Sequence, residues 1–478
     1  MLELRFLFNY NDINDNNDCG ISGVIFLLKR YLLFVLIFFS IFSISVEAFA
    51  EAYPDLSAEA YILVEMETGQ VLAEKNADQR RSPASTTKIM TALIALERAD
   101  LDKEMTASEY AINSIPYDYV TAGIRIGETL KFKHLLDLMM ITSANEASNI
   151  IAENIAEDGT LQGFTQLMNE KAKELGLNNT NFTNANGTED ENHYSTARDL
   201  ANLAREAMKN ETFREVVGRK EFELPDTNLR KKEQWQTGHL TYTNQLLNSR
   251  SSYYSQITGI KTGYTDNAGM CLVSSAVNPD GLELVAVVLG TKSYDILFRE
   301  SQQLLEYGYK NYSIRELAKK GEYVDRVEVE DAVDGKKLEI ITNNGFEWIL
   351  PANDEILNEK LESEIKFNKP DDEPFKAPIE AGQVVGVKEY RYDGEIIGEV
   401  ELVAKKSIEK TTFAIIRDKY KEIVSNERFI FGLKAAGILL VLIIILSYIL
   451  KAINHRNRRN RRYRYTRPKH SRKRHYRY

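Results

Sequence analysis

Apolar positions between residue 51 and about residue 310 recur with the periods of both strands and helices. Two short apolar runs, 60–64 and 69–73, are separated by the turn residues Glu67-Thr68-Gly69 and predict a β-hairpin. Apolar residues at helical spacing follow Pro83 and predict a largely buried helix. Further helices are predicted at residues 131–142, 162–175 and 196–208, and buried strands at 270–276 and 282–289. A sheet covered by helices is the expected class for this part of the chain.

The pattern changes at about residue 314 to short strand-like pieces. Examples are residues 325–329 and 337–342, which lie between turn signals such as Asp334-Gly335 and Asn344-Gly345. An all-β module is therefore expected up to about residue 407. The charged, helix-compatible residues 408–428 that follow are expected to form a stalk.

The N-terminal region carries the layout of a secretory signal peptide. Lys29-Arg30 precedes the apolar run 31–46, and Ala48-Phe49-Ala50 follows it, so cleavage is expected after Ala50. An uncleaved membrane anchor is the alternative, although the run is short for a membrane span. A polar stretch before a signal sequence is unusual, and we hypothesise that translation begins at an internal codon near Val24.

A second apolar run, residues 429–450, is interrupted only by Lys434 and is long enough to cross a bilayer. The tail that follows, residues 451–478, contains 13 Lys or Arg and no acidic residue. The positive-inside rule then predicts a cytoplasmic tail, with residues 51–428 on the outer side of a cell membrane that the chain spans once. A buried core helix is the alternative for the apolar run.

The formal charge of −9 conceals a strong segregation of charge. Without the 13 positive charges of the tail it becomes −22, so the outer part is strongly acidic and no nucleic-acid partner is expected for it. The tail, in which Arg and Tyr are interleaved at 461–465, is expected to contact lipid and to fix the topology, with nucleic-acid contact as the alternative.

Cysteine and histidine are too scarce for a disulfide framework, a zinc cluster or a Ser-His-Asp triad. Cys19 lies in the segment expected to be removed, which leaves Cys271 alone and makes a disulfide framework impossible. Cys271 lies in an apolar run and is expected to be a small buried hydrophobic residue. Three of the six His fall in the tail, so neither a zinc cluster nor a Ser-His-Asp triad is expected, and no metal or organic cofactor is predicted.

Three motifs carry the candidate chemistry: Ser85-Thr86-Thr87-Lys88, Ser143-Ala144-Asn145 and Lys261-Thr262-Gly263. On a helix, residues three apart share a face, so the amine of Lys88 can reach the hydroxyl of Ser85 and act as its general base. A lysine works as a base only if its pKa is lowered, which burial and a second cation at Lys261 would achieve. Lys88 and Lys261 are therefore expected to lie close together. Taken alone, Ser85 would be read as an ordinary helix N-cap.

In this order the motifs resemble the signature of penicillin-binding proteins and serine β-lactamases. The longer runs 81–93 (RSPASTTKIMTAL) and 259–269 (GIKTGYTDNAG) are similar to the low-molecular-mass D-alanyl-D-alanine carboxypeptidases, the S11 family of serine peptidases. The resemblance covers about residues 55–405. It implies an α/β (α+β) catalytic domain of the serine β-lactamase and penicillin-binding-protein type, a small all-β sandwich domain and a C-terminal transmembrane helix. The expected boundaries are 1–50 for the N-terminal extension and signal peptide, 51–313 for the catalytic domain, 314–407 for the sandwich, 408–428 for the stalk, 429–450 for the membrane helix and 451–478 for the tail.

The resemblance also implies roles for individual residues. Ser85 is the nucleophile, Lys88 the general base and Ser143 the relay of a proton toward the leaving amine. The remaining predicted site residues contact the substrate or complete the oxyanion hole, which the backbone N–H groups of Ser85 and Tyr264 form. These residues are Asn145, Lys261, Thr262, Gly263 and Tyr264.

The chain departs from the family pattern at three places. Relatives commonly carry, at the position of Leu297, an Arg that helps to hold the substrate carboxylate; here Arg299 follows the Phe instead. Asn184-Ala185-Asn186-Gly187 stands where relatives often read Asn-Pro-His-Gly, and Glu146 where they usually have Asp. The first departure puts carboxylate recognition in question.

The implied function is a penicillin-binding serine D-Ala-D-Ala carboxypeptidase that removes the terminal D-alanine from peptidoglycan stem pentapeptides. Its expected partners are stem peptides, β-lactam antibiotics, which would acylate Ser85, and the cell membrane, through the C-terminal helix. A peptidoglycan DD-endopeptidase is one alternative, and a non-catalytic, penicillin-sensing wall-binding protein is another. A β-lactamase is a less favoured alternative.

Overall fold

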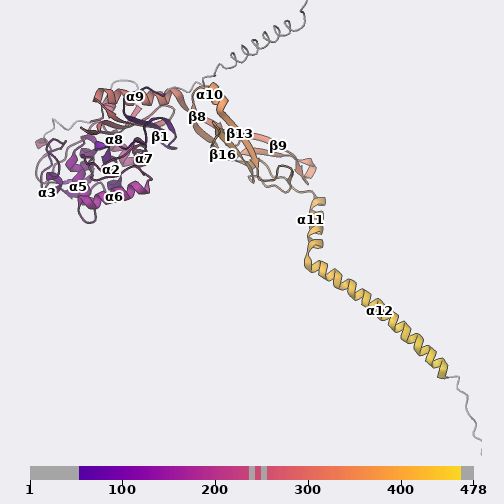
Figure 1. Cartoon of the computed structure of the whole chain (residues 1–478). Helices are drawn as coiled ribbons and strands as arrows, with labels where there is room; N and C mark the ends of the chain where they lie inside the picture. The colour runs from indigo at the N-terminus through magenta and orange to yellow at the C-terminus, as the bar shows by residue number, and fades with distance from the viewer. Residues whose placement is uncertain (1–52, 236–242, 249–255, 465–478) are drawn as a thin grey trace, which may run out of the picture.

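The computed structural model describes residues 53–235, 243–248 and 256–464. These residues form two folded domains in chain order, followed by two helices that lead away from both domains (Figure 1). The segment expected to be a signal peptide lies outside the described residues, as do Cys19 and the last residues of the basic tail.

An antiparallel sheet of five strands forms the centre of the first domain, in the order β2-β1-β7-β6-β5. The strands are β1 (Ala60–Glu65), β2 (Val71–Lys75), β5 (Ile257–Thr265), β6 (Gly269–Val277) and β7 (Glu283–Thr291). The predicted hairpin is confirmed as β1 and β2, and the two predicted buried strands as β6 and β7. The strand β5 contains the Lys261-Thr262-Gly263 motif and lies at the edge of the sheet.

Side chains on the sheet alternate between two hydrophobic cores, because successive residues of a strand point to opposite faces. On β1, Ile62 and Val64 enter the larger core, whereas Tyr61 and Leu63 enter the smaller one. The smaller core is covered by α9 (Tyr294–Asn311), which packs on β6 and β7. The longer helices on the other side of the sheet gather around the larger core (Figure 1).

The remaining helices of the first domain include the four that the sequence predicts, after Pro83 and near residues 131–142, 162–175 and 196–208, together with others that it does not. They are η1 (Ala84–Thr87), α2 (Lys88–Arg98), α3 (Glu109–Asn113), α4 (Phe132–Ile141), α5 (Asn145–Ile155), α6 (Leu161–Glu174), α7 (Ala197–Met208), α8 (Glu211–Gly218), η2 (Lys232–Gln234) and η4 (Gln245–Asn248). A separate two-stranded antiparallel sheet pairs β3 (Glu104–Thr106) with β4 (Thr129–Lys131). Hydroxyl side chains fix several helix starts, because they accept an otherwise unpaired backbone N–H. Thr160 accepts from Gly163 at α6, Thr196 from Asp199 at α7, and Ser293 from Ile296 at α9.

The second domain is built mainly of strands, as the sequence predicts. Its principal sheet has the order β13-β15-β16-β11-β9, and two small sheets pair β12 with β8 and β10 with β14. The elements are β8 (Tyr312–Ala318), β9 (Tyr323–Val327), β10 (Val329–Glu330), η6 (Val333–Gly335), β11 (Leu338–Thr342), β12 (Phe346–Pro351), α10 (Asp354–Lys360), β13 (Leu361–Phe367), β14 (Phe375–Lys376), β15 (Val384–Tyr392) and β16 (Glu395–Ala404).

Two helices complete the described chain. Arg417 on α11 (Thr412–Ser425) donates to both carboxylate oxygens of Asp331, at 3.1 and 2.6 Å, and so ties this helix to the second domain. Phe413, Ile416 and Tyr420 lie at helical spacing on α11 and are exposed. The last helix, α12 (Glu427–Arg464), is by length and composition able to cross a membrane within Glu427–Arg458, where an 18-residue window has a mean hydropathy of 2.8.

Candidate active site

Ser85 lies in the turn η1, immediately before the α-helix that contains Lys88. The turn begins at Ala84, whose φ of +48° is uncommon for a residue with a side chain. It is closed by Thr86, whose amide and hydroxyl both donate to the carbonyl of Pro83, at 3.2 and 2.7 Å. Strained backbone of this kind concentrates at functional sites. The side chain of Ser85 stays half-buried, so it can meet a ligand.

Lys88 is completely buried, and its amine contacts three oxygen atoms. Nζ lies 2.9 Å from Oγ of Ser85, 2.8 Å from Oδ1 of Asn145 and 2.6 Å from the carbonyl oxygen of Asn186. An ammonium group donates to all three oxygens. A neutral amine has only two N–H groups. Once these bind Asn145 and Asn186, its lone pair faces the hydroxyl of Ser85.

The electrostatic surroundings favour this neutral amine. Burial lowers the pKa of Lys88 well below its ordinary value of 10.5, and the charge of Lys261 lowers it further, while Glu146 opposes both effects. Lys261 is also buried, and burial lowers its pKa to about 7. Its Nζ donates to the carbonyl of Thr262 at 3.0 Å. The predicted proximity of the two lysines is therefore present in the structure.

The second motif lies at the junction of α4 and α5. Ser143 is buried and has a φ of +64°, and Asn145 is the first residue of α5. The amide of Asn145 is held on both sides, since Oδ1 accepts from Lys88 and Nδ2 donates to the carbonyl of Val120 at 2.9 Å. Among the described residues, the hydroxyl of Ser143 has no hydrogen-bond partner. The structure thus joins Asn145 to Lys88 but does not join Ser143 to either of them.

The edge strand β5 runs directly past the nucleophile. A Cβ atom added to Gly263 would lie only 3.0 Å from the backbone nitrogen of Ser85. Gly187 also packs against the turn η1, because a Cβ atom there would overlap the carbonyl of Ala84. Thr262 donates from Oγ1 to Oγ1 of Thr243 at 2.7 Å, and the side chain of Tyr264 is exposed and bonded to Asp266.

Two supports of the site were not assigned a role from the sequence. The first is the carbonyl of Asn186, whose side chain donates to Oδ1 of Asn149 at 3.1 Å. The second is buried His193, whose Nδ1 accepts from the amide of Thr183 at 3.0 Å, so that Nε2 donates to Oγ1 of Thr87 at 2.8 Å. Burial lowers the pKa of His193 to about 4, which keeps the ring neutral. No motif marks a main-chain carbonyl, so the first support had no signal in the sequence.

Leu297, which stands where relatives commonly carry an arginine, lies in an apolar environment. Leu297 is fully buried in the smaller core beneath α9, where an arginine would need a polar partner. Arg299, the nearby cation, has an exposed side chain. Leu297 therefore supplies no charge to the site.

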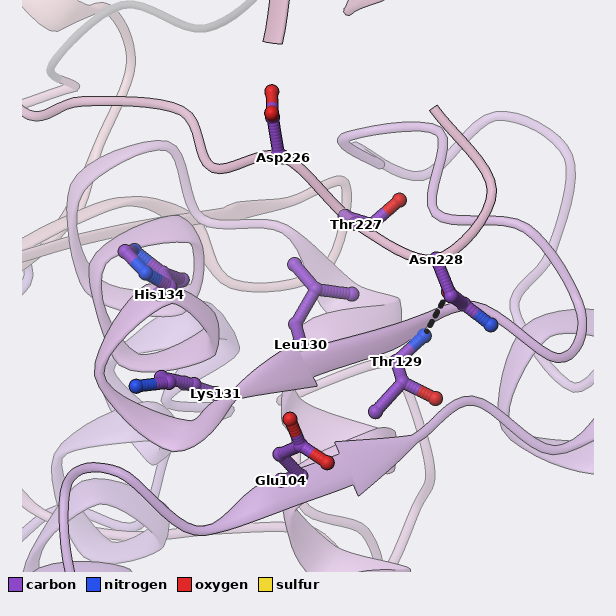
Figure 2. Close-up of a pocket in the computed structure, with 8 residues that line it drawn as sticks. All are labelled: Glu104, Thr129, Leu130, Lys131, His134, Asp226, Thr227 and Asn228. Atoms are coloured by element: carbon purple, nitrogen blue, oxygen red, sulfur yellow. Dashed lines mark hydrogen bonds between the residues drawn. The ribbon is translucent and has the colours of Figure 1, made fainter. Parts of the chain in front are cut away.

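A separate pocket of about 400 Å³ lies beside the paired strands β3 and β4 (Figure 2). Figure 2 shows Lys131 and His134 at one end of it and Asn228 at the other, bonded to the amide of Thr129. None of the predicted site residues lines this pocket. Within the described ranges, no group of three His, Cys, Asp or Glu side chains could hold a metal ion.

Family profiles match both domains. The profile of peptidase S11, D-alanyl-D-alanine carboxypeptidase, matches residues 47–293, and that of the penicillin-binding protein 5 C-terminal domain matches residues 312–410. The chain is 32% identical to D-alanyl-D-alanine carboxypeptidase DacF of Bacillus subtilis over 401 residues, which cover 81% of this chain and 96% of the relative. It is 30% identical to DacC of Escherichia coli over 370 residues, covering 75% and 86%.

Solved structures agree with this assignment. The crystal structure of the D-alanyl-D-alanine carboxypeptidase DacD from Francisella tularensis is 30% identical, with a TM-score of 0.56, and the match covers 75% of this chain and 95% of that one. Penicillin binding protein 5 from Haemophilus influenzae is 25% identical, with a TM-score of 0.58 and coverages of 75% and 99%.

Proposed function

The chain belongs to the S11 family of D-alanyl-D-alanine carboxypeptidases, and from this premise we propose that it removes the terminal D-alanine of peptidoglycan stem pentapeptides through an acyl-enzyme on Ser85. The observation that carries the proposal is the position of Lys88. Its amine is fully buried, has a lowered pKa and lies 2.9 Å from Oγ of Ser85. A hydroxyl beside such an amine is an activated nucleophile.

Acylation begins when Oγ of Ser85 attacks the carbonyl carbon of the penultimate D-alanine. The neutral amine of Lys88 takes the hydroxyl proton as the new C–O bond forms. Negative charge then develops on the carbonyl oxygen, and the backbone N–H groups of Ser85 and Tyr264 stabilise it. The closeness of Gly263 to Ser85 supports this pairing, because it brings β5 alongside the nucleophile.

Collapse of the tetrahedral intermediate breaks the peptide bond. The leaving nitrogen takes up the proton that Lys88 holds, and terminal D-alanine departs. Ser143 is proposed to relay this proton, for which its hydroxyl must come within hydrogen-bonding distance of Lys88 once the substrate is bound. Water then attacks the acyl carbon while Lys88 accepts one of its protons. The proton returns to Oγ of Ser85 as the ester bond breaks, which releases a tetrapeptide and restores the enzyme.

The substrate lies along the open edge of β5 in this proposal. A backbone is expected to approach closely at Gly263, and Thr262 and Lys261 are proposed to bind the terminal carboxylate. Asn145 is expected to hydrogen-bond the substrate's peptide group. β-Lactams carry a reactive amide in the place of the scissile bond, and the enzyme is expected to be acylated by them at Ser85.

The C-terminal helices suggest where the enzyme works. We propose that α12 crosses the cell membrane, with the two domains outside and the basic tail in the cytoplasm. The apolar stripe of α11, formed by Phe413, Ile416 and Tyr420, supports a position against the outer membrane surface, because α12 begins only two residues after α11 ends.

The test is mass spectrometry of a pentapeptide ending in D-Ala-D-Ala after incubation with the full chain in detergent. The expected result is the loss of one alanine with the wild type and no loss with Ser85→Ala. A cross-linked stem-peptide dimer serves as a second substrate. Cleavage of the dimer alone would replace the carboxypeptidase by an endopeptidase. An intact pentapeptide, with Ser85 still acylated by penicillin, would refute the proposed substrate while retaining the nucleophile.

A further inference from the structure

We propose that Glu146 is a positioning residue of the active site, which fixes the segment Val120–Ile124 and, through it, Asn145 and Lys88. The proposal rests on the function proposed above. Glu146 is the second residue of α5 and is 1% exposed. Its Oε1 accepts hydrogen bonds from the amides of Ala122 at 2.6 Å and Ile124 at 3.3 Å.

The segment held by Glu146 also holds Asn145. The carbonyl of Val120 accepts from the backbone amide of Asn145 at 3.0 Å and from its Nδ2 at 2.9 Å. These contacts leave Oδ1 of Asn145 directed at Nζ of Lys88, 2.8 Å away. A continuous set of hydrogen bonds therefore runs from Glu146 through the segment to Asn145 and the amine.

The second carboxylate oxygen of Glu146, Oε2, differs from Oε1 in its surroundings. Among the residues that the structure describes, buried Oε2 has no hydrogen-bond partner and no cation forms a salt bridge with Glu146. Burial raises the pKa of Glu146, while the N–H groups of its own residue and of residues 122–124 lower it. The start of α5 adds a favourable partial positive charge. An anion here raises the pKa of Lys88, against the effects of burial and of the charge of Lys261.

Other charged groups around this region are already compensated. Arg230 donates to the carbonyl of Gly123 at 3.0 Å, but it also forms a buried ion pair with Glu128 at 2.8 Å. His193 affects Lys88 from another side and is neutral near pH 7, since burial lowers its pKa to about 4. The charged groups that still act on the pKa of Lys88 are Lys261, which lowers it, and Glu146, which raises it.

The experiment measures how the rate of acylation by a fluorescent penicillin depends on pH, using the full chain in detergent. Acylation needs neutral Lys88, so the rate rises with pH through the pKa of that residue. Glu146→Gln keeps the side-chain shape and removes the charge. We expect the rising limb to move to lower pH by about one unit, the scale on which a nearby charge shifts a buried pKa. The falling limb, set by Lys261, is expected to stay in place, because burial alone lowers that pKa.

Three further variants separate positioning from general stability. Glu146→Ala removes the hydrogen bonds as well, and its maximal rate is expected to fall by about tenfold or more, as misplacement of catalytic groups does. Glu146→Asp restores the charge and should return the rising limb toward the wild-type pH. Glu300→Gln is the matched control: its buried carboxylate binds the amides of Ser57 and Ala58, at 2.8 and 2.9 Å, far along the chain from the motifs. It should lower thermal stability without moving either limb.

The proposal is overturned if Glu146→Gln leaves the rising limb unmoved, or if Glu146→Ala keeps a maximal rate within twofold of the wild type. Failure of the proposed function looks different, because penicillin acylation does not require the peptide substrate. A wild-type chain that is acylated but leaves the pentapeptide intact refutes the substrate and not the role of Glu146. A wild-type chain that reacts with neither overturns both.

Discussion

Replacing Gly263 by alanine tests the closest contact between the edge strand and the nucleophile. The added Cβ atom would lie 3.0 Å from the backbone nitrogen of Ser85, 3.1 Å from Cβ of Ala84 and 3.1 Å from the carbonyl oxygen of Pro83. Ordinary contacts of a Cβ atom begin near 3.4 Å. The first and third neighbours are backbone atoms, so the turn η1 can relieve the contact only by moving as a unit away from β5.

The size of the effect follows from that movement. Overfilling a packed site costs typically about 1–3 kcal/mol. For a domain of this size each kcal/mol lowers the melting temperature by about 2–4 °C. A displacement of about 1 Å at a catalytic group can cost a factor of about 100 in rate, so a shift of a few tenths of an ångström at Ser85 is expected to slow acylation by about tenfold.

The assay is the rate of acylation by a fluorescent penicillin, measured together with thermal unfolding of the same full-length sample. Gly345→Ala is the matched control, because a Cβ atom there meets its nearest neighbour, the carbonyl oxygen of Ala318, at an ordinary 3.4 Å. It should change neither quantity. A Gly263→Ala variant with the acylation rate and melting temperature of the wild type would show that β5 does not pack on the nucleophile as described.

Three other changes are expected to give measurable results. Lys88→Ala should lower the acylation rate by about 10²- to 10⁴-fold, the usual contribution of a general base, while circular dichroism stays unchanged. The unfolded chain protonates His193 near pH 6.5 and the folded chain only near pH 4, so the free energy of unfolding should fall by about 3 kcal/mol as the pH drops through that window; denaturant titrations of His193→Gln should lack this part of the slope. Breaking the buried pair by Glu128→Ala or Arg230→Met alone should cost about 3–5 kcal/mol of stability, measured by denaturant midpoint, and the double change less than the sum.

Much of the fold could be predicted because the dominant signal was hydrophobic periodicity over long segments. The helix predicted at 162–175 is α6, and the strand predicted at 282–289 is β7, each within two residues at either end. Finer geometry did not follow from that signal. Ser85 lies in a 3-10 turn and not in the α-helix, because the turn depends on the positive φ of Ala84, a conformation that alanine rarely adopts.

In the site, contacts between motif side chains could be predicted, whereas contacts with backbone groups could not. Ser85 and Lys88 were predicted to meet because three residues of helical chain bring their side chains together, and Lys261 was placed near them because a basic lysine needs a second cation. The carbonyl of Asn186 could not be predicted, since every residue type offers the same oxygen. Glu146 was recorded only as a longer replacement for aspartate. Its partners are amides more than twenty residues earlier in the chain, and no spacing rule connects the two.

The sequence leaves open which residue binds the substrate carboxylate, because Leu297 stands where relatives commonly carry an arginine. Leu297 belongs to the smaller core and Arg299 is exposed, so neither residue supplies a buried cation. We infer that recognition of the terminal carboxylate falls on β5, where Lys261 is buried and Thr262 offers a hydroxyl. That hydroxyl now donates to Thr243, and it must exchange this bond for one to the carboxylate. The exchange would keep the number of hydrogen bonds from Thr262 constant, so we expect the specificity for a free C-terminus to depend mainly on the charge of Lys261. Because burial holds the pKa of Lys261 near 7, affinity for the carboxylate should weaken as the pH rises through that value.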